Sequence, residues 1–108
     1  MTNIKKTSYP KEKINILFLE NISDKAVQYF QQSGYHSVKK ITGALSEKDL
    51  IKEIKNVHLL GIRSKTNITP EILDAAKKLQ AIGCFCIGVN QVNLQAATEK
   101  GIAVFNAP

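Results

Sequence analysis

The sequence predicts an α/β domain built on a doubly wound, five-stranded parallel sheet that is incomplete at its C-terminal end. Three observations lead to this prediction. Short apolar runs alternate with segments of helical periodicity, the helical segments begin at capping residues, and 108 residues suffice for one domain with its own core. Strands and helices that alternate in this way are joined by right-handed crossovers, which produce a parallel sheet covered on both faces.

The first predicted elements are a buried strand, an amphipathic helix and a weaker strand. Residues 14–20 form a nearly continuous apolar run, which is typical of a buried strand. Residues 24–33 carry apolar side chains at helical spacing, with Ser23 as the N-cap and Gly34 as the stop. The weaker strand covers residues 37–42.

The second predicted helix begins at Ser46, where Asp49 completes a variant of the capping box. Its apolar face consists of Leu50, Ile51, Ile54 and Val57, and a third strand follows at residues 58–64.

The third predicted helix begins at Thr69, a capping residue, with Pro70 in the first helical position. Its inward face holds Ile72, Leu73, Ala76 and Leu79. The remaining elements are a strand at 81–87, a short helix at 94–100 between the cap Asn93 and the stop Gly101, and a strand at 102–106. Together these elements indicate a flavodoxin-like fold with strand order 2-1-3-4-5.

Arg63 is the only arginine of the chain, and it follows the third predicted strand. Ligands of doubly wound sheets bind at the carboxyl ends of the strands, which is where this residue falls. Arginine offers a rigid fork that matches phosphate or carboxylate, whereas lysine is a flexible point charge. We therefore expect an anion site formed by the loops at 21–22, 43–44, 63–67, 88–92 and 106–108.

Charge and composition narrow the classes of partner. The net charge is +6, but the lysines are spread along the chain and often lie beside acids, so we expect no nucleic-acid binding. No apolar run approaches the length of a membrane span, and we expect no membrane partner. Residues 1–13 are polar and predict a flexible arm rather than a secretory signal. Cys84 and Cys86 predict free, buried thiols and a cytoplasmic location, with too few ligands for a zinc site.

The residues at the ligand-binding edge do not match other known uses of this fold. The sequence lacks the acidic cluster of a response-regulator receiver, the hydroxyl-rich phosphate loop of a flavodoxin and the G-x-G-x-x-G dinucleotide motif. His36 lies before the second predicted strand and His58 begins the third, at the sheet edge opposite Arg63, so both are expected to have structural or surface roles. Glu20 ends the first strand on the ligand-binding edge, where it could act as an acid or base or could cap nearby backbone amides.

Four stretches in the second half of the chain resemble the D-isomer-specific 2-hydroxyacid dehydrogenase family: residues 61–66, 75–92, 96–97 and 101–108. The resemblance runs from about residue 13 and is most specific from Gly61 onward. It implies that residues 14–108 are the N-terminal segment of a substrate-binding domain, split in sequence around an NAD-binding domain that is absent here. We therefore expect a fragment whose sheet is partly uncovered.

The resemblance also implies an activity. The branch that shares the stretch 83–88 uses NAD to oxidise 3-phosphoglycerate to 3-phosphohydroxypyruvate, the step that opens serine biosynthesis. The full-length parent is expected to be a homo-oligomer that binds NAD mainly through the missing domain. Its catalytic groups belong to missing segments, so no catalytic residue and no metal ligand are expected in this chain.

The role that the resemblance implies for residues of this chain is substrate recognition. The resemblance implies that Arg63 and Ser64 contact a small phosphorylated hydroxy acid, with Lys65 adding charge. It further implies that the turn formed by Ile87, Gly88 and Val89 holds the substrate carboxylate through backbone amides, with Ile87 near the nicotinamide of the cofactor. Asn90 and Asn93 replace the aspartates common in the family, so no essential charge is expected at those positions.

Two alternatives remain open. The chain could be a standalone anion-binding or interaction module that pairs with itself, or with a dehydrogenase subunit, through its uncovered face. It could also derive from a dehydrogenase for another D-2-hydroxy acid. A reading frame that continues past Pro108 into a G-x-G-x-x-G sequence would exclude the module.

Overall fold

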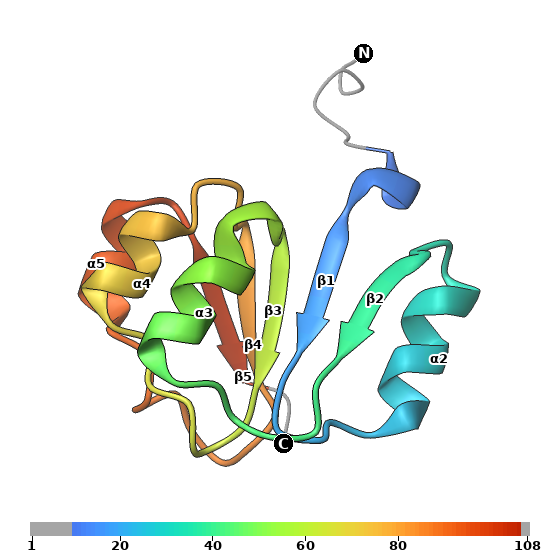
Figure 1. Ribbon diagram of the computed structural model, residues 1–108, viewed down its shortest axis with the longest axis horizontal. Coiled ribbons are helices and arrows are strands. Elements are labelled where there is room, and N and C mark those ends of the chain that lie inside the picture. Colours follow the sequence, from blue (N-terminus) through green and yellow to red (C-terminus); the bar gives the residue numbers. More distant parts are fainter. Residues whose placement is uncertain (1–9, 107–108) are drawn as a thin grey trace.

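The computed structural model of the chain describes residues 10–106 and contains a five-stranded parallel sheet with the order β2-β1-β3-β4-β5 (Figure 1). This order confirms the predicted doubly wound topology. The strands are β1 (Asn15–Phe18), β2 (Ser37–Lys40), β3 (Leu59–Ile62), β4 (Ala81–Cys84) and β5 (Ala103–Asn106).

Four α-helices connect the strands, and each begins at the capping residue that the sequence indicates. The side chains of Ser23, Ser46, Thr69 and Asn93 accept hydrogen bonds from backbone N–H groups in the first helical turn. The helices are α2 (Asp24–Gln32), α3 (Glu47–Glu53), α4 (Pro70–Ala75) and α5 (Leu94–Glu99), and a 3-10 turn, η2 (Ile54–Asn56), continues α3. None of the helices in the described part of the chain combines the length and hydropathy of a transmembrane span.

All five strands are shorter than the sequence predicts, and all except β5 end earlier at the carboxyl end. β1 stops at Phe18 because Glu20 and Asn21 both adopt left-handed backbone conformations, with φ of 61° and 54°. After β3, backbone N–H groups turn toward the carboxylate of Glu20 instead of a neighbouring strand. At the end of β4, the side chain of Asn106 donates hydrogen bonds to the carbonyl of Cys84 and to those of Cys86 and Gly88 in the chain that follows.

The predicted arm at residues 1–13 is described only in its last part. Residues 1–9 lie outside the described residues, as do residues 107–108 of the predicted fifth loop. Lys11–Lys13 form a 3-10 helix, η1, and the ammonium of Lys11 donates a hydrogen bond to the carbonyl of Ser33 at 3.0 Å. The same ammonium lies 5.5 Å from the centre of the Tyr35 ring, so this part of the arm is attached to the domain.

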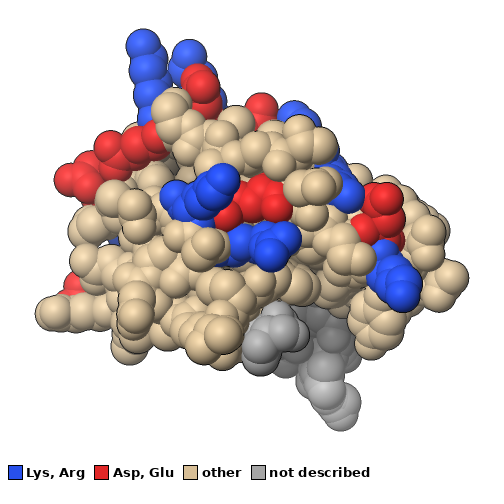
Figure 2. Space-filling view, turned by 90° about the horizontal axis from the view of Figure 1, so that it is seen from below, with Lys and Arg blue, Asp and Glu red and all other residues tan. Residues whose placement is uncertain are grey.

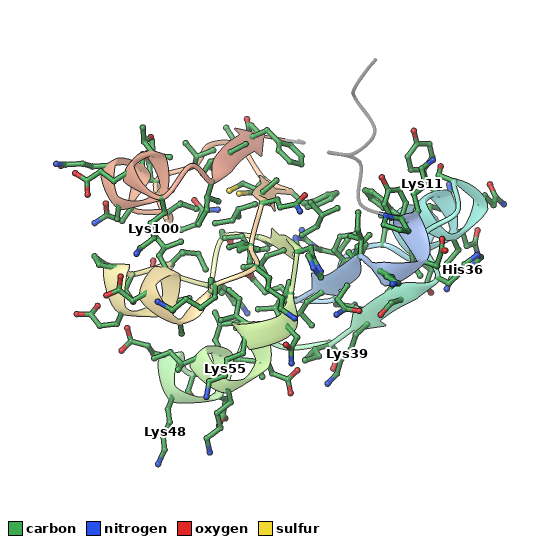
Figure 3. All side chains as sticks on the ribbon, turned by 90° about the horizontal axis from the view of Figure 1, so that it is seen from above. Lys11, His36, Lys39, Lys48, Lys55 and Lys100 are labelled. Carbon is green, nitrogen blue, oxygen red and sulfur yellow. The ribbon has the colours of Figure 1, made fainter. Side chains whose placement is uncertain are left out.

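Charged side chains are distributed over several elements. Figure 2 shows basic and acidic groups interspersed on the face that contains the carboxyl ends of the strands. The lysines labelled in Figure 3 come from different elements: Lys48 lies on α3 and Lys55 on η2, while Lys100, which follows α5, pairs with Asp74 at 2.8 Å. The positive charge is therefore not concentrated on a single surface of the described residues.

The core has two layers, one on each face of the sheet. The larger layer contains the residues of β1, β3 and β4 that face α3, α4 and α5, including Leu17, Leu60 and Ile82. The smaller layer lies on the face of α2 and is centred on Ile16 and Phe18. Since α2 contacts mainly β2, no helix among residues 10–106 covers the sheet beyond β1 on this face (Figure 3).

The uncovered part of the sheet is apolar. An apolar groove crosses it, lined by Ile16, Phe18, Phe30, Leu59, Leu60, Ala81, Gly83, Phe85 and Phe105. Phe105 is 49% exposed despite its large apolar ring. The expected uncovered face is therefore present within residues 10–106.

Candidate functional site

Two adjacent hollows lie at the carboxyl edge of the sheet. The arginine-side hollow has a volume of about 360 Å³ and is lined by Glu20, Asn21, Thr42, Gly43, Ala44, Arg63, Ser64 and Lys65. The glycine-side hollow has a volume of about 420 Å³ and is lined by Ser64, Asn67, Cys86, Ile87, Gly88, Asn90 and Gln91. Ser64 lines both hollows, so one ligand of modest size could contact both.

The segment that carries Arg63 is held in place by the carboxylate of Glu20. The Oε2 atom accepts hydrogen bonds from the backbone N–H of Arg63 at 2.8 Å and of Thr66 at 3.1 Å, and from the Thr66 hydroxyl at 2.7 Å. The Oε1 atom accepts a fourth bond from the N–H of Lys65 at 2.9 Å. The loop backbone is thereby fixed while the residues Arg63, Ser64 and Lys65 remain exposed.

Glu20 is buried, with 8% of its surface exposed, and this environment acts on its ionisation in two opposite ways. Burial by itself raises the pKa, because it penalises the charged form. The hydrogen bonds from the Thr66 hydroxyl and from the N–H groups of Lys65, Arg63 and Thr66 favour the charged form and outweigh burial. The pKa of Glu20 is therefore lowered from its ordinary value of 4.5, and the group is a carboxylate at neutral pH. The capping role considered for Glu20 is the one that its contacts display.

Gln91 connects the two hollows. Its side-chain amide donates a hydrogen bond to the carbonyl of Arg63 at 2.8 Å and another to the sulfur of Cys86 at 3.0 Å. The Cys86 thiol in turn donates to the carbonyl of Gly88 at 3.5 Å. The position of the Arg63 segment therefore depends on the loop that follows β4.

Asn106 holds the same loop from the end of β5. Its side-chain amide donates to the carbonyls of Cys84 at 3.2 Å and Gly88 at 3.3 Å, and also to the carbonyl of Cys86. The two hydrogens of this amide are thus shared among three carbonyl groups at and just beyond the end of β4.

The three residues of the turn after β4, Ile87, Gly88 and Val89, differ in backbone conformation and in exposure. Gly88 has φ of +149°, a conformation that favours glycine, and a Cβ at this position would meet open space. Ile87 is 93% exposed, although its side chain is apolar. Val89 packs against the larger core layer and does not line either hollow, so any contact of Val89 with a ligand would come from its backbone.

The structure therefore brings five of the six residues singled out for substrate or cofactor contact to the two hollows: Arg63, Ser64, Lys65, Ile87 and Gly88. Gln91 and Asn106 were not given a role from the sequence. No local pattern indicates their contacts, because their partners lie up to 28 residues away along the chain.

The two cysteines differ in burial, which the sequence does not predict. Both are free, and Cys84 is buried as expected, but the prediction of a buried thiol is wrong for Cys86, which is partly exposed. The chain turns out of the sheet after Cys84, which brings Cys86 to the rim of the glycine-side hollow. Burial, with a smaller contribution from Cys86, raises the pKa of the Cys84 thiol to about 11.

The two histidines lie away from the hollows. His58 is buried, and its Nδ1 accepts a hydrogen bond from the backbone N–H of Asn15 at 3.0 Å, at the amino end of β1. Burial and, to a smaller extent, the charge of Lys78 lower the pKa of His58. His36 is exposed beside β2. Within residues 10–106, no group of three or more histidine, cysteine, aspartate or glutamate side chains is arranged to hold a metal ion.

The chemistry that this arrangement offers is anion recognition. The arginine-side hollow contains a guanidinium, an ammonium and a hydroxyl group, and its one carboxylate is already engaged by four donors. Arginine can bind a phosphate or carboxylate through two parallel hydrogen bonds, which fixes the orientation of the ligand.

Comparison with known proteins identifies the family of the chain. Residues 16–108 match the family described as D-isomer specific 2-hydroxyacid dehydrogenase, catalytic domain. D-3-phosphoglycerate dehydrogenase of Dictyostelium discoideum is 52% identical over 102 residues, and that of Escherichia coli K12 is 46% identical over 103 residues. These matches cover 94% and 95% of this chain but 25% of each relative, so the chain spans about a quarter of their length.

A solved structure shows the same fold. The NAD+-bound 3-phosphoglycerate dehydrogenase of Entamoeba histolytica superposes with a TM-score of 0.74 at 22% identity, over 88% of this chain and 33% of that one. The match of residues 16–108 covers most of the sheet and both hollows. The chain therefore belongs to the D-isomer specific 2-hydroxyacid dehydrogenase family.

Proposed function

We propose that residues 14–108 are the N-terminal segment of the substrate-binding domain of an NAD-dependent dehydrogenase that oxidises 3-phosphoglycerate to 3-phosphohydroxypyruvate, the first step of serine biosynthesis. The observation that carries the proposal is the exposed Arg63, Ser64 and Lys65 on a fixed backbone at the carboxyl edge. The names of relatives that are about half identical to this chain support a phosphorylated substrate for the proposed enzyme.

In this proposal the substrate is held at both ends. Arg63 binds the phosphate through its planar fork, Ser64 donates a hydrogen bond between the two hollows, and Lys65 adds positive charge. The backbone amides of the turn at Gly88 and Val89 bind the carboxylate. Two anionic groups at the ends of a small molecule match two adjacent hollows that share one serine.

NAD supplies the chemistry by accepting a hydride from the substrate, and most of its binding lies outside this chain. Ile87 fits a contact with the nicotinamide, because its apolar side chain is 93% exposed at the rim of the glycine-side hollow. The uncovered apolar groove beside Phe105 is suited to receive a further segment of the same protein.

The proposal is tested by substituting Arg63 with lysine in the full-length protein. Arg63→Lys keeps the charge but removes the two-pronged contact, so kcat/KM for 3-phosphoglycerate should fall by a factor equivalent to roughly 1 to 3 kcal/mol. Lys48→Arg serves as the control, since Lys48 points away from the body on α3 (Figure 3). An unchanged kcat/KM in Arg63→Lys would remove Arg63 from the substrate site.

The same assay separates a second candidate, a dehydrogenase for another D-2-hydroxy acid. The phosphate-binding role of Arg63 requires that the wild-type protein prefer 3-phosphoglycerate over unphosphorylated D-glycerate, and that Arg63→Lys reduce this preference. A preference for an unphosphorylated substrate would favour the second candidate.

A further inference from the structure

Glu20 is an unusual group for an anion site, because it places a buried carboxylate in the lining of the arginine-side hollow. None of the ion pairs among residues 10–106 includes it. Its charge is balanced by three backbone N–H groups and one hydroxyl, all from the segment between Arg63 and Thr66. Backbone N–H groups that converge in this way form a nest that binds anions.

The nest therefore already contains an anion that belongs to the protein. If the nest were empty, the converging N–H groups would themselves attract the substrate. The backbone from which the side chains of Arg63 and Lys65 extend would then not be held in one conformation. With the carboxylate in place, the N–H groups point inward while the residues Arg63, Ser64 and Lys65 remain exposed at the hollow.

The backbone at Glu20 is adapted to this task. Glu20 and the next residue, Asn21, both have left-handed conformations, which cost side-chain-bearing residues on the order of 1 kcal/mol or more each. Their N–H groups bind the carbonyls of Gly43 at 3.0 Å and Ile41 at 3.2 Å. The strained turn is thus fixed to the loop after β2, and it directs the Glu20 side chain toward the segment after β3.

We propose that Glu20 is a positioning residue for the substrate: it occupies the nest as an internal anion and fixes the Arg63 segment in the conformation that binds the phosphate. This inference rests on the proposed function. It predicts that Glu20 acts on substrate binding through its negative charge, because a neutral side chain of the same shape cannot accept all four hydrogen bonds. A glutamine would direct its own N–H₂ group against at least one backbone N–H.

Kinetics of the full-length protein test the proposal. Glu20→Gln should raise KM for 3-phosphoglycerate about tenfold or more and leave kcat within about threefold, since the reacting groups are untouched. Glu53→Gln is the control with the same change of charge, because Glu53 pairs with Lys39 on the surface, outside both hollows. An unchanged KM in a folded Glu20→Gln protein would overturn the proposal, as would an equal rise in Glu53→Gln.

Chemical rescue separates positioning from a general loss of structure. Glu20→Ala removes the CH₂–COO⁻ group, which is the size of acetate, and leaves a nest that opens on the arginine-side hollow. Added acetate should lower KM of Glu20→Ala at least about threefold, whereas it should not lower KM of the wild-type protein. A folded Glu20→Ala protein that acetate does not rescue would contradict the proposal.

A third measurement does not depend on turnover. Amide hydrogen exchange at Arg63, Lys65 and Thr66 should accelerate about tenfold or more in Glu20→Gln and stay unchanged in Glu53→Gln. Inorganic phosphate should perturb the Arg63 amide signal of the wild-type chain at lower concentration than that of Glu20→Gln. If the wild-type protein does not oxidise 3-phosphoglycerate, the proposed function fails, and the phosphate titration alone decides the role of Glu20: equal titrations would overturn it.

Discussion

Gly61→Ala is expected to destabilise the fold through a single steric contact. Gly61 lies in β3 opposite Phe18 of β1, and a Cβ at this position would point toward the smaller core layer, on the same side of the sheet as α2. A Cβ at residue 61 would lie 2.4 Å from Cδ1 and 2.8 Å from Cε1 of the Phe18 ring, and 3.1 Å from Cδ1 of Ile22. Ordinary contacts begin at 3.4 Å, so the ring would have to retreat by about 1 Å (3.4 − 2.4).

The Phe18 ring has little freedom to retreat. It makes edge-to-face contacts with the rings of Phe30 and Phe85, each at a centroid distance of 5.7 Å. Overpacking of this kind costs about 1 to 3 kcal/mol, whereas the reduced entropy of the unfolded chain returns about 0.4 to 1 kcal/mol. We expect Gly61→Ala to lower the free energy of unfolding by about 1 to 2 kcal/mol.

Urea denaturation of Gly61→Ala and Gly43→Ala measures the effect against a matched control. A Cβ at Gly43 would meet no atom within 4 Å, so Gly43→Ala should be neutral or stabilising. The double variant Gly61→Ala/Phe18→Leu should be more stable than the sum of its single effects by at least about 0.5 kcal/mol. If Gly61→Ala is as stable as Gly43→Ala, the steric argument is refuted.

Three further outcomes are expected. Because the pKa of Glu20 is lower in the folded chain than in the unfolded chain, the unfolded state takes up more protons as the pH falls below about 5, and the free energy of unfolding falls with the pH. Glu20→Gln should lose less of its free energy of unfolding in acid than the wild-type protein, and urea denaturation that finds the same pH dependence in both would contradict this. Gly88→Ala should lower the free energy of unfolding by about 1 to 2 kcal/mol, because φ of +149° strains alanine even though a Cβ there would meet open space. A variant as stable as the wild-type protein would show that the turn relaxes. Iodoacetamide at neutral pH should label Cys86 before Cys84, whose pKa is raised to about 11, and mass spectrometry that finds equal labelling would disprove the difference.

Local signals in the sequence were sufficient for the fold. Serine, threonine and asparagine caps were located correctly because each cap binds a backbone N–H only two or three residues away. The strand order followed from the alternation of strands and helices, since crossover connections are nearly always right-handed. Arg63 could be assigned to the carboxyl edge for the same reason.

The ends of the strands could not be predicted in the same way. Periodicity extended β1 to Glu20 and β4 to Ile87, but both strands stop earlier, because polar side chains compete for the backbone groups at this edge. Cys86 was assigned to the buried strand for this reason and instead lies at a hollow. An apolar run indicates which residues are buried. It does not indicate where a side chain takes over the hydrogen bonds of the backbone and ends the pairing between strands.

The sequence by itself determined that this chain is a doubly wound domain and that Arg63 lies at the carboxyl edge of its sheet. Only the tertiary structure decided how that arginine is held. Glu20 meets the Arg63 segment across 43 to 46 residues of chain, and Gln91 meets it across 28. Such contacts follow from the register of neighbouring strands and from two left-handed residues, and neither leaves a periodic pattern along the sequence.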